Sequence, residues 1–125
     1  MNRFLFFTAI FVIIMATLAV MAFETDDTNL GVDRVIDGDT LVLTNGATVR
    51  LARVDAPEWD QEGGDEATAA LKRAVDGAEV RLVDDKDQPD FDKYDRRVAF
   101  IYIDERNVNE ELIEGGFADY WEPRP

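Results

Sequence analysis

Two pairs of carboxylates flank a short predicted hairpin in the first half of the chain. Asp37 and Asp39 stand around a glycine at the entrance of one predicted strand, and Asp55 and Glu58 follow the end of the next. Paired carboxylate oxygens could hold a hard divalent cation, or accept a proton from water. Taken alone, the first pair is typical of a tight turn and the second of a strand stopped by Pro57. Because only a two-residue turn joins the two strands, both pairs could converge on one site.

Arginine side chains accompany these carboxylates, and their planar guanidinium forks are suited to binding phosphate. Arg50 lies five residues before Asp55, so on a regular strand the two side chains point to opposite faces of the sheet. Both can serve one site only if the strand bends or bulges between them. A straight, regular strand there would count against a shared site. Arg53, between them, is interpreted as a surface charge.

A second basic cluster precedes the last long predicted strand. Lys93 and Tyr94 stand beside Arg96 and Arg97 in a loop that is otherwise acidic. A cationic cluster of this kind could bind a phosphate group. It is equally typical of solvated charges that protect the edge of a sheet from pairing.

Composition narrows the chemistry. The chain contains no Cys and no His, so proton transfer depends on Asp, Glu, Lys, Tyr or water. Any bound metal is a hard cation with oxygen ligands, Ca²⁺ or Mg²⁺ before Zn²⁺. The formal net charge of -14 argues at first sight against a polyanionic partner. The excess of 17 Asp over 3 Lys is typical of proteins that work in concentrated salt, where self-repulsion is screened, so the hypothesis is a halophilic source.

Periodicity predicts a mainly β domain with short helices. A helix is expected from Asp65 or Glu66 to a C-terminal Gly77, and a second from an N-cap at Asn109 to Glu114. A type I′ turn at Asn45-Gly46 is expected to join the second and third strands. The five predicted strands are Val32–Ile36, Thr40–Thr44, Ala47–Val54, Val80–Val83 and Val98–Ile103. This order of elements favours a five-stranded OB-fold-type Greek-key barrel.

The N-terminal segment is a predicted targeting sequence. The run from Phe4 to Phe23 carries no charge and follows Arg3. It is interpreted either as a signal peptide cleaved after Ala22 or as a retained membrane anchor. The domains expected are therefore a signal or anchor over residues 1–23, an acidic linker over 24–31 and the barrel over 32–125. Either interpretation predicts an exported protein, secreted or held at the outer face of the cell membrane.

Several motifs, in this order, resemble those of the staphylococcal nuclease (thermonuclease) family. They cover residues 32–121 and are Val35–Thr40, Val49–Leu51, Val54–Glu58, Asp92–Arg96 and Val108–Gly116. The resemblance implies a monomeric, Ca²⁺-dependent endonuclease of low sequence specificity that hydrolyses phosphodiester bonds of DNA and/or RNA and leaves 3′-phosphate ends; Mg²⁺ is the less favoured cofactor. The alternative is a catalytically silent barrel that binds nucleic acid or protein.

The resemblance also implies roles for individual residues. Asp39, Asp55 and the backbone carbonyl of Ala56 would bind the Ca²⁺ ion. Glu58 would position or deprotonate the attacking water, and Arg50 and Arg96 would stabilise the charge that grows on the phosphate. Lys93 and Tyr94 would line the nucleotide pocket, with Tyr120 or Trp121 as the candidate for its C-terminal side. Asp95 stands where the family usually has Gly, although Asp is a residue that tolerates a left-handed φ.

Overall fold

The computed structural model describes residues 29–124. The predicted targeting segment and most of the predicted linker lie outside the described residues. Within residues 29–124, no helix is long and apolar enough to cross a bilayer. The elements, in chain order, are β1 (Leu30–Asp37), β2 (Thr40–Leu43), β3 (Thr48–Leu51), β4 (Val54–Asp55), α2 (Gly64–Val75), β5 (Glu79–Asp84), β6 (Arg97–Ile103), β7 (Arg106–Asn107), α3 (Val108–Glu114) and β8 (Asp119–Tyr120).

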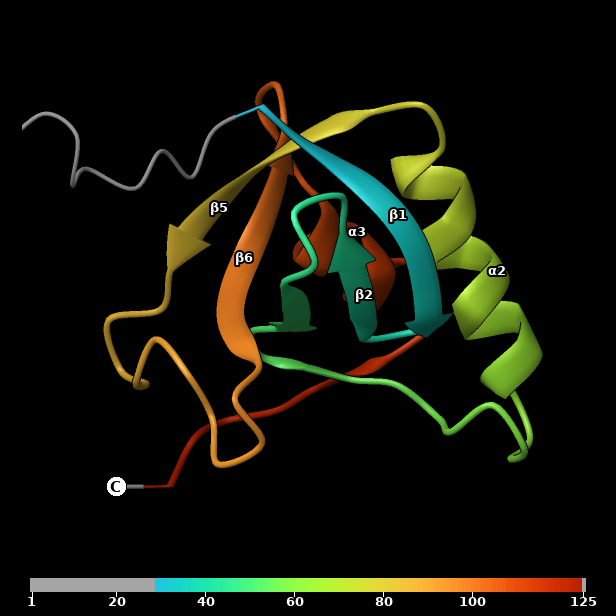
Figure 1. Cartoon of the computed structure of the whole chain (residues 1–125). Helices are drawn as coiled ribbons and strands as arrows, with labels where there is room; N and C mark the ends of the chain where they lie inside the picture. Colours follow the sequence, from blue (N-terminus) through green and yellow to red (C-terminus); the bar gives the residue numbers. More distant parts are fainter. Residues whose placement is uncertain (1–28, 125) are drawn as a thin grey trace, which may run out of the picture.

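The long strands close into a barrel (Figure 1). Their order is β3-β2-β1-β5-β6, and a parallel pairing of β3 with β6 joins the two ends. Strand β7 extends β6, and β4 pairs with β8 in a separate two-stranded sheet. Closure removes the free edges that an open sheet would leave. The predicted five-stranded barrel is confirmed.

Strand β1 bends, so that it pairs with both β2 and β5. Its register with β2 shifts between Val32 and Arg34 and again between Val35 and Asp37, and its first two residues pair with β5. Such irregularities bend a strand and increase its twist, as barrel closure requires.

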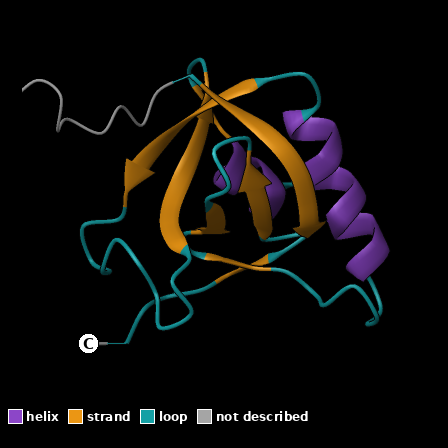
Figure 2. Cartoon of the chain, viewed as in Figure 1, coloured by secondary structure: helices purple, strands orange, loops and turns teal. Residues whose placement is uncertain are grey.

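The two helices pack against the barrel strands, and Figure 2 shows α2 on the outside of the barrel. Helix α2 lies against β1, and α3 contacts both β6 and α2. Helix α2 turns Ala67, Leu71 and Val75 inward. It ends as predicted, with Gly77 in the left-handed region at a φ of 65° just after the cap.

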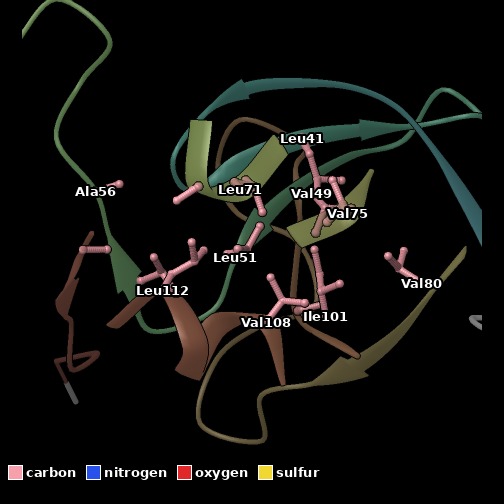
Figure 3. Packing of buried hydrophobic residues seen from close by; sticks show 14 of the residues in the cluster. Leu41, Val49, Leu51, Ala56, Leu71, Val75, Val80, Ile101, Val108 and Leu112 are labelled. Carbon is pink, nitrogen blue, oxygen red and sulfur yellow. The ribbon is translucent and has the colours of Figure 1, made fainter. Parts of the chain in front are cut away.

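A single apolar core fills the space between barrel and helices (Figure 3). Leu41, Leu51, Leu71, Ile101 and Val108 are at most 1% exposed and come from five different elements. Each buried aliphatic side chain of this size contributes about 1.5–3 kcal/mol relative to an exposed one. This rigid core supports the strand ends on which the predicted site residues stand.

The structure corrects two expectations about the hairpin and its second strand. Asn45 does not have positive φ, so the turn is not type I′. Instead Gly46 has a φ of 88° and its N–H donates to Leu43 O at 2.9 Å, as in a type I turn followed by a left-handed glycine. The single strand expected over 47–54 is interrupted after Leu51, because Arg53 adopts a φ of 67°.

The second helix has a different cap from the one predicted. Asn107 is the N-cap, and its side chain accepts the Glu110 N–H at 3.2 Å. Asn109, the residue predicted for that role, is 1% exposed and points into the protein. Its amide accepts the Ile101 N–H at 2.9 Å and donates to Ala52 O at 2.8 Å. The prediction was wrong because the side chain bonds to residues 8 and 57 positions away along the chain rather than to its own helix.

Candidate active site

The interruption between β3 and β4 brings Arg50 and Asp55 to one cleft. A regular strand would have turned them to opposite faces, but the left-handed residue at position 53 reverses the alternation. The predicted bend is confirmed. Both side chains line a cleft of about 390 Å³ at this end of the barrel.

The guanidinium of Arg50 is held by the same interruption. Its Nη1 donates to Leu51 O at 2.9 Å and to Val54 O at 2.6 Å. Its Nη2 lies 3.4 Å from Asp39 Oδ2. The side chain remains 24% exposed. Arg50 is therefore oriented by backbone carbonyls, with part of its fork accessible from the cleft, as a phosphate-binding group requires.

The loop that precedes β6 forms another part of the cleft lining. Lys93, Tyr94 and Arg96 all line the cleft. The Arg96 guanidinium carbon lies 5.2 Å from the centre of the Tyr94 ring, and Lys93 Nζ lies 5.0 Å from it. Asp95, which stands where the family usually has Gly, has a φ of 62°, in the left-handed region that Asp tolerates.

Asp92 positions this loop, a role that the sequence interpretation did not assign. Its Oδ1 accepts the N–H groups of Tyr94 and Arg96, and its Oδ2 accepts Arg96 Nε at 2.7 Å. Although partial burial opposes ionisation, these hydrogen bonds hold the pKa of Asp92 below its usual value. The sequence feature that could have indicated this role is an Asp four residues before an Arg in the loop that precedes a strand.

The remaining predicted residues, Asp39, Ala56 and Glu58, are not among the residues that line the cleft and lie beside it. Asp39 is 7% exposed, and its Oδ2 accepts the Ala56 N–H at 3.0 Å. Its Oδ1 accepts the Thr40 hydroxyl at 3.0 Å. Asp39, from the first predicted carboxylate pair, thus contacts the backbone between the two residues of the second pair. Its Oδ2 also lies 3.4 Å from Nη2 of Arg50, which lines the cleft.

Asp37, named with Asp39 as a candidate cation ligand but given no role by the family resemblance, joins this group. Burial, a hydrogen bond to the Asp39 side chain and the negative charges of Asp39 and Glu58 raise the pKa of Asp37 to about 6. Gly38 makes the packing feasible, because a Cβ there would stand 2.6 Å from Ala67 Cβ. The spacing of two Asp around a Gly was the signal for this acidic group.

Glu58 is exposed on a loop that packs tightly against the start of α2. Its N–H donates to Gln61 Oε1 at 3.1 Å, and its carbonyl accepts the Gln61 N–H at 2.9 Å. A Cβ on Gly64 would stand 1.9 Å from Glu58 O, so only glycine allows this approach. The loop therefore holds Glu58 near Asp37, close enough to influence its pKa.

The donors fit a hard cation by their chemistry. Asp37, Asp39, Asp55 and Glu58 supply only carboxylate oxygens, and the mutual repulsion seen at Asp37 would be relieved by a divalent ion. Within residues 29–124, no three acidic side chains form a ready-made metal-binding cluster. The predicted ligand set of Asp39, Asp55 and the Ala56 carbonyl, which has only two acidic side chains, stays a prediction.

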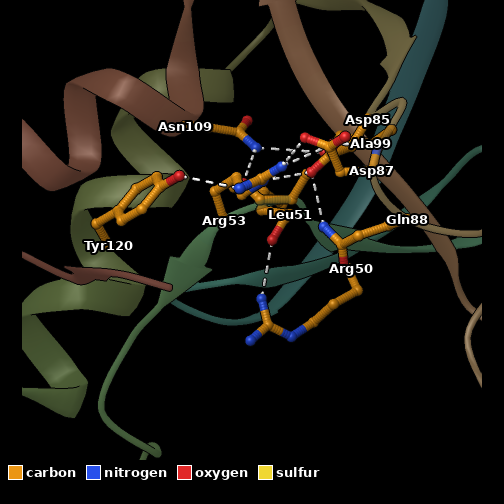
Figure 4. A network of polar contacts seen from close by, with 10 residues as sticks. Arg50, Leu51, Arg53, Asp85, Asp87, Gln88, Ala99, Asn109 and Tyr120 are labelled. Atoms are coloured by element: carbon orange, nitrogen blue, oxygen red, sulfur yellow. Dashed lines mark hydrogen bonds and ion pairs between the residues drawn. The ribbon is translucent and has the colours of Figure 1, made fainter. Parts of the chain in front are cut away.

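Arg53 is not the surface charge predicted from the sequence (Figure 4). Its side chain is 13% exposed, and its guanidinium contacts Asp85, Asp87 and Tyr120. These partners lie 32, 34 and 67 residues away along the chain. Local sequence therefore contained no signal for this network.

Comparison with known proteins agrees with this architecture. The chain matches the family described as "Staphylococcal nuclease homologue" over residues 48–124, a span that begins after the Asp37–Asp39 turn. It is 38% identical over 99 residues to "Endonuclease YncB" of Bacillus subtilis (strain 168), covering 72% of this chain and 46% of that protein. It is 37% identical over 89 residues to an "Uncharacterized endonuclease" of Haemophilus influenzae, covering 68% and 48%.

A third relative is the "Thermonuclease" of Staphylococcus hyicus. The two are 34% identical over 94 residues, which cover 68% of this chain and 54% of that protein. The chain spans about half the length of these curated relatives. The resemblance predicted from the motifs is confirmed, and the chain belongs to the staphylococcal nuclease homologue family.

Proposed function

We propose that this chain is a Ca²⁺-dependent endonuclease that hydrolyses phosphodiester bonds of DNA and/or RNA with little sequence specificity. The observation that carries the proposal is the cleft in which Arg50, Asp55 and Arg96 meet, although they come from separate parts of the chain. The relatives named endonuclease or thermonuclease support the same activity.

The cleft also answers the charge objection raised by the acidic composition. Among the residues that line it, Arg50, Lys93 and Arg96 are cationic and Asp55 and Asp92 are acidic. The charge of Arg53, which also lines it, is compensated by Asp85 and Asp87. A local positive site on an acidic protein can still attract a phosphodiester, because charges beyond about 10 Å are screened at moderate ionic strength.

In the proposed reaction, Arg50 and Arg96 bind the scissile phosphate and stabilise the charge that develops on its oxygens. Glu58 accepts a proton from water as the water oxygen bonds to phosphorus and the bond to the leaving oxygen breaks. The leaving oxygen takes its proton from solvent. Ca²⁺ would be held by Asp39, Asp55 and the Ala56 carbonyl, and when bound would polarise a phosphoryl oxygen.

Labelled DNA and RNA, incubated with the full-length chain, test this proposal. Cleavage is expected with Ca²⁺ and not with EDTA, and less with Mg²⁺. Arg50→Ala and Glu58→Ala are each expected to lower kcat by about 10²–10³-fold. The matched control is Arg34→Ala, which removes an arginine whose ion pair with Asp33 is exposed. Absence of cation-dependent cleavage at every salt concentration would exclude the nuclease proposal.

The proposal extends to where and how the protein works. We propose export through residues 1–23, either by secretion or by anchoring at the outer membrane face, and function as a monomer. The net charge of -14 supports activity in concentrated salt. Cell fractionation tests the location, and size-exclusion chromatography with light scattering tests the monomer. Folding and activity that are complete at low salt and lost at molar salt would contradict the halophilic source.

A further inference from the structure

Arg53 occupies a backbone conformation that arginine rarely adopts. Its φ is 67°, in the left-handed region that favours glycine and tolerates Asn and Asp. A non-glycine residue persists there only when surrounding contacts stabilise it. The contacts that stabilise this conformation therefore indicate the structural role of Arg53.

The Arg53 guanidinium is nearly saturated by its partners. Nε lies 2.5 Å from Asp85 Oδ2, Nη2 lies 3.1 Å from Asp85 Oδ1 and 2.8 Å from Asp87 Oδ2, and Nη1 donates to the Tyr120 hydroxyl at 2.9 Å. The Asp85 side chain is 4% exposed. Two carboxylates compensate the charge of Arg53, unlike Arg50, whose guanidinium binds mainly carbonyls.

These contacts join three separate segments around the cleft. The first is the turn between β3 and β4. The second is the loop after β5, where Asp85 Oδ2 also accepts Gln88 Nε2 at 2.8 Å. The third is the C-terminal segment, where the Trp121 N–H donates to Arg53 O at 2.8 Å. Gln88 and Trp121 both line the cleft, and Figure 4 shows Asp85 and Tyr120 reaching Arg53 from different elements.

We propose that the Arg53 side chain positions the wall of the cleft, holding Gln88 through Asp85 and Trp121 through the neighbouring Tyr120 hydroxyl, and so sets the affinity for the nucleic acid substrate. Arg53 takes no part in the chemical step. The inference rests on the proposed nuclease function, because it concerns the substrate that this cleft binds. An amide and an indole held in place offer a hydrogen-bonding group and a stacking surface to a nucleotide next to the scissile phosphate.

The first measurement is the division between KM and kcat with a short oligonucleotide at fixed Ca²⁺ and salt. Arg53→Gln is expected to raise KM about tenfold and to leave kcat within about twofold, because a displaced wall weakens binding without moving Arg50. Arg53→Lys should recover part of the loss, since an ammonium can still pair with Asp85. Arg106→Gln is the matched control. It breaks a similar two-point pair with Glu111 that lies outside the cleft.

The second measurement needs no catalysis. The chain contains two Trp residues, so in a Trp59→Phe background the fluorescence comes from Trp121 alone. Arg53→Gln in that background should make Trp121 emission easier to quench with acrylamide, while Arg106→Gln should leave it unchanged. If Arg53→Gln fails to fold, the double variant Arg53→Gln/Asp85→Asn replaces it, because that variant leaves no unpaired buried carboxylate.

These measurements separate failure of the positioning role from failure of the proposed function. If the wild-type protein is inactive but Arg53→Gln still makes Trp121 easier to quench, the proposed nuclease function is refuted, and so is the role of Arg53 in substrate affinity. The positioning of the cleft wall by Arg53 is not refuted. An active protein in which Arg53→Gln lowers only the melting temperature, or lowers kcat at constant KM, would overturn the proposal.

Discussion

Replacing the buried Asn109 with Ala should destabilise the protein far more than any helix-cap substitution. The side chain is 1% exposed and makes three hydrogen bonds, to the N–H of Ile101 and to the carbonyls of Ala52 and Ala99. Each such bond contributes about 1 kcal/mol net, and a buried group left unsatisfied costs roughly 1–3 kcal/mol. The Ala99 carbonyl still accepts the Ala52 N–H. The substitution therefore leaves two groups without their partner, the Ile101 N–H and the Ala52 carbonyl. The expected loss is about 3–7 kcal/mol, from two unsatisfied groups and one further lost hydrogen bond.

The matched control is Asn107→Ala, which removes the observed N-cap two residues earlier. That cap makes one hydrogen bond, to the Glu110 N–H, and its loss should cost about 1 kcal/mol. Urea unfolding of both variants at one salt concentration, followed by circular dichroism, measures the two free energies. The cap predicted from sequence at Asn109 gives the same order with much smaller losses, near 1 kcal/mol at Asn109 and almost none at Asn107, so that result would also contradict the structural assignment. Losses that agree within about 0.5 kcal/mol would refute the structural assignment.

Three further predictions follow from particular positions. The pKa of Asp85 is held well below its usual range by hydrogen bonds from its arginine partner, so its stabilising effect is present above about pH 4 and is lost as pH falls further. Asp85→Asn should therefore cost roughly 2–3 kcal/mol in urea unfolding at pH 7 and progressively less as pH is lowered from about 4 towards 2; a loss that stays constant over that range would contradict this. Gly64→Ala would place a Cβ 1.9 Å from Glu58 O, so it should displace the loop and lower kcat at least about tenfold. The control in the same helix is Thr68→Ala, which removes a buried hydroxyl without a hydrogen-bond partner among the described residues and should be neutral in activity and stability. Asp95→Gly should be tolerated or stabilising by up to about 1 kcal/mol, because glycine adopts a φ of 62° without steric cost, and a loss above that in a thermal melt would contradict it.

Local sequence was sufficient wherever the controlling interaction is local. The pairing of the hairpin strands and the end of α2 at Gly77 depend on backbone preferences of the residues themselves, and both were predicted, although the type of the hairpin turn was not. The lack of His and Cys restricts the chemistry to carboxylates and hard cations before any coordinates are considered. The bend between Arg50 and Asp55 was also predicted, since the period of a strand requires it if both are to share a site.

The arrangement of the site depended on contacts between distant residues. Arg53 and Asn109 were both misassigned, one as a surface charge and the other as a helix cap, because their partners lie up to 67 and 57 residues away. The close approach of Asp37, Asp39 and Glu58 arises in the same way, from the packing of one turn against Ala56 and helix α2. Long, flexible side chains can reach many partners, and only the closed barrel brings particular carboxylates and carbonyls within their reach.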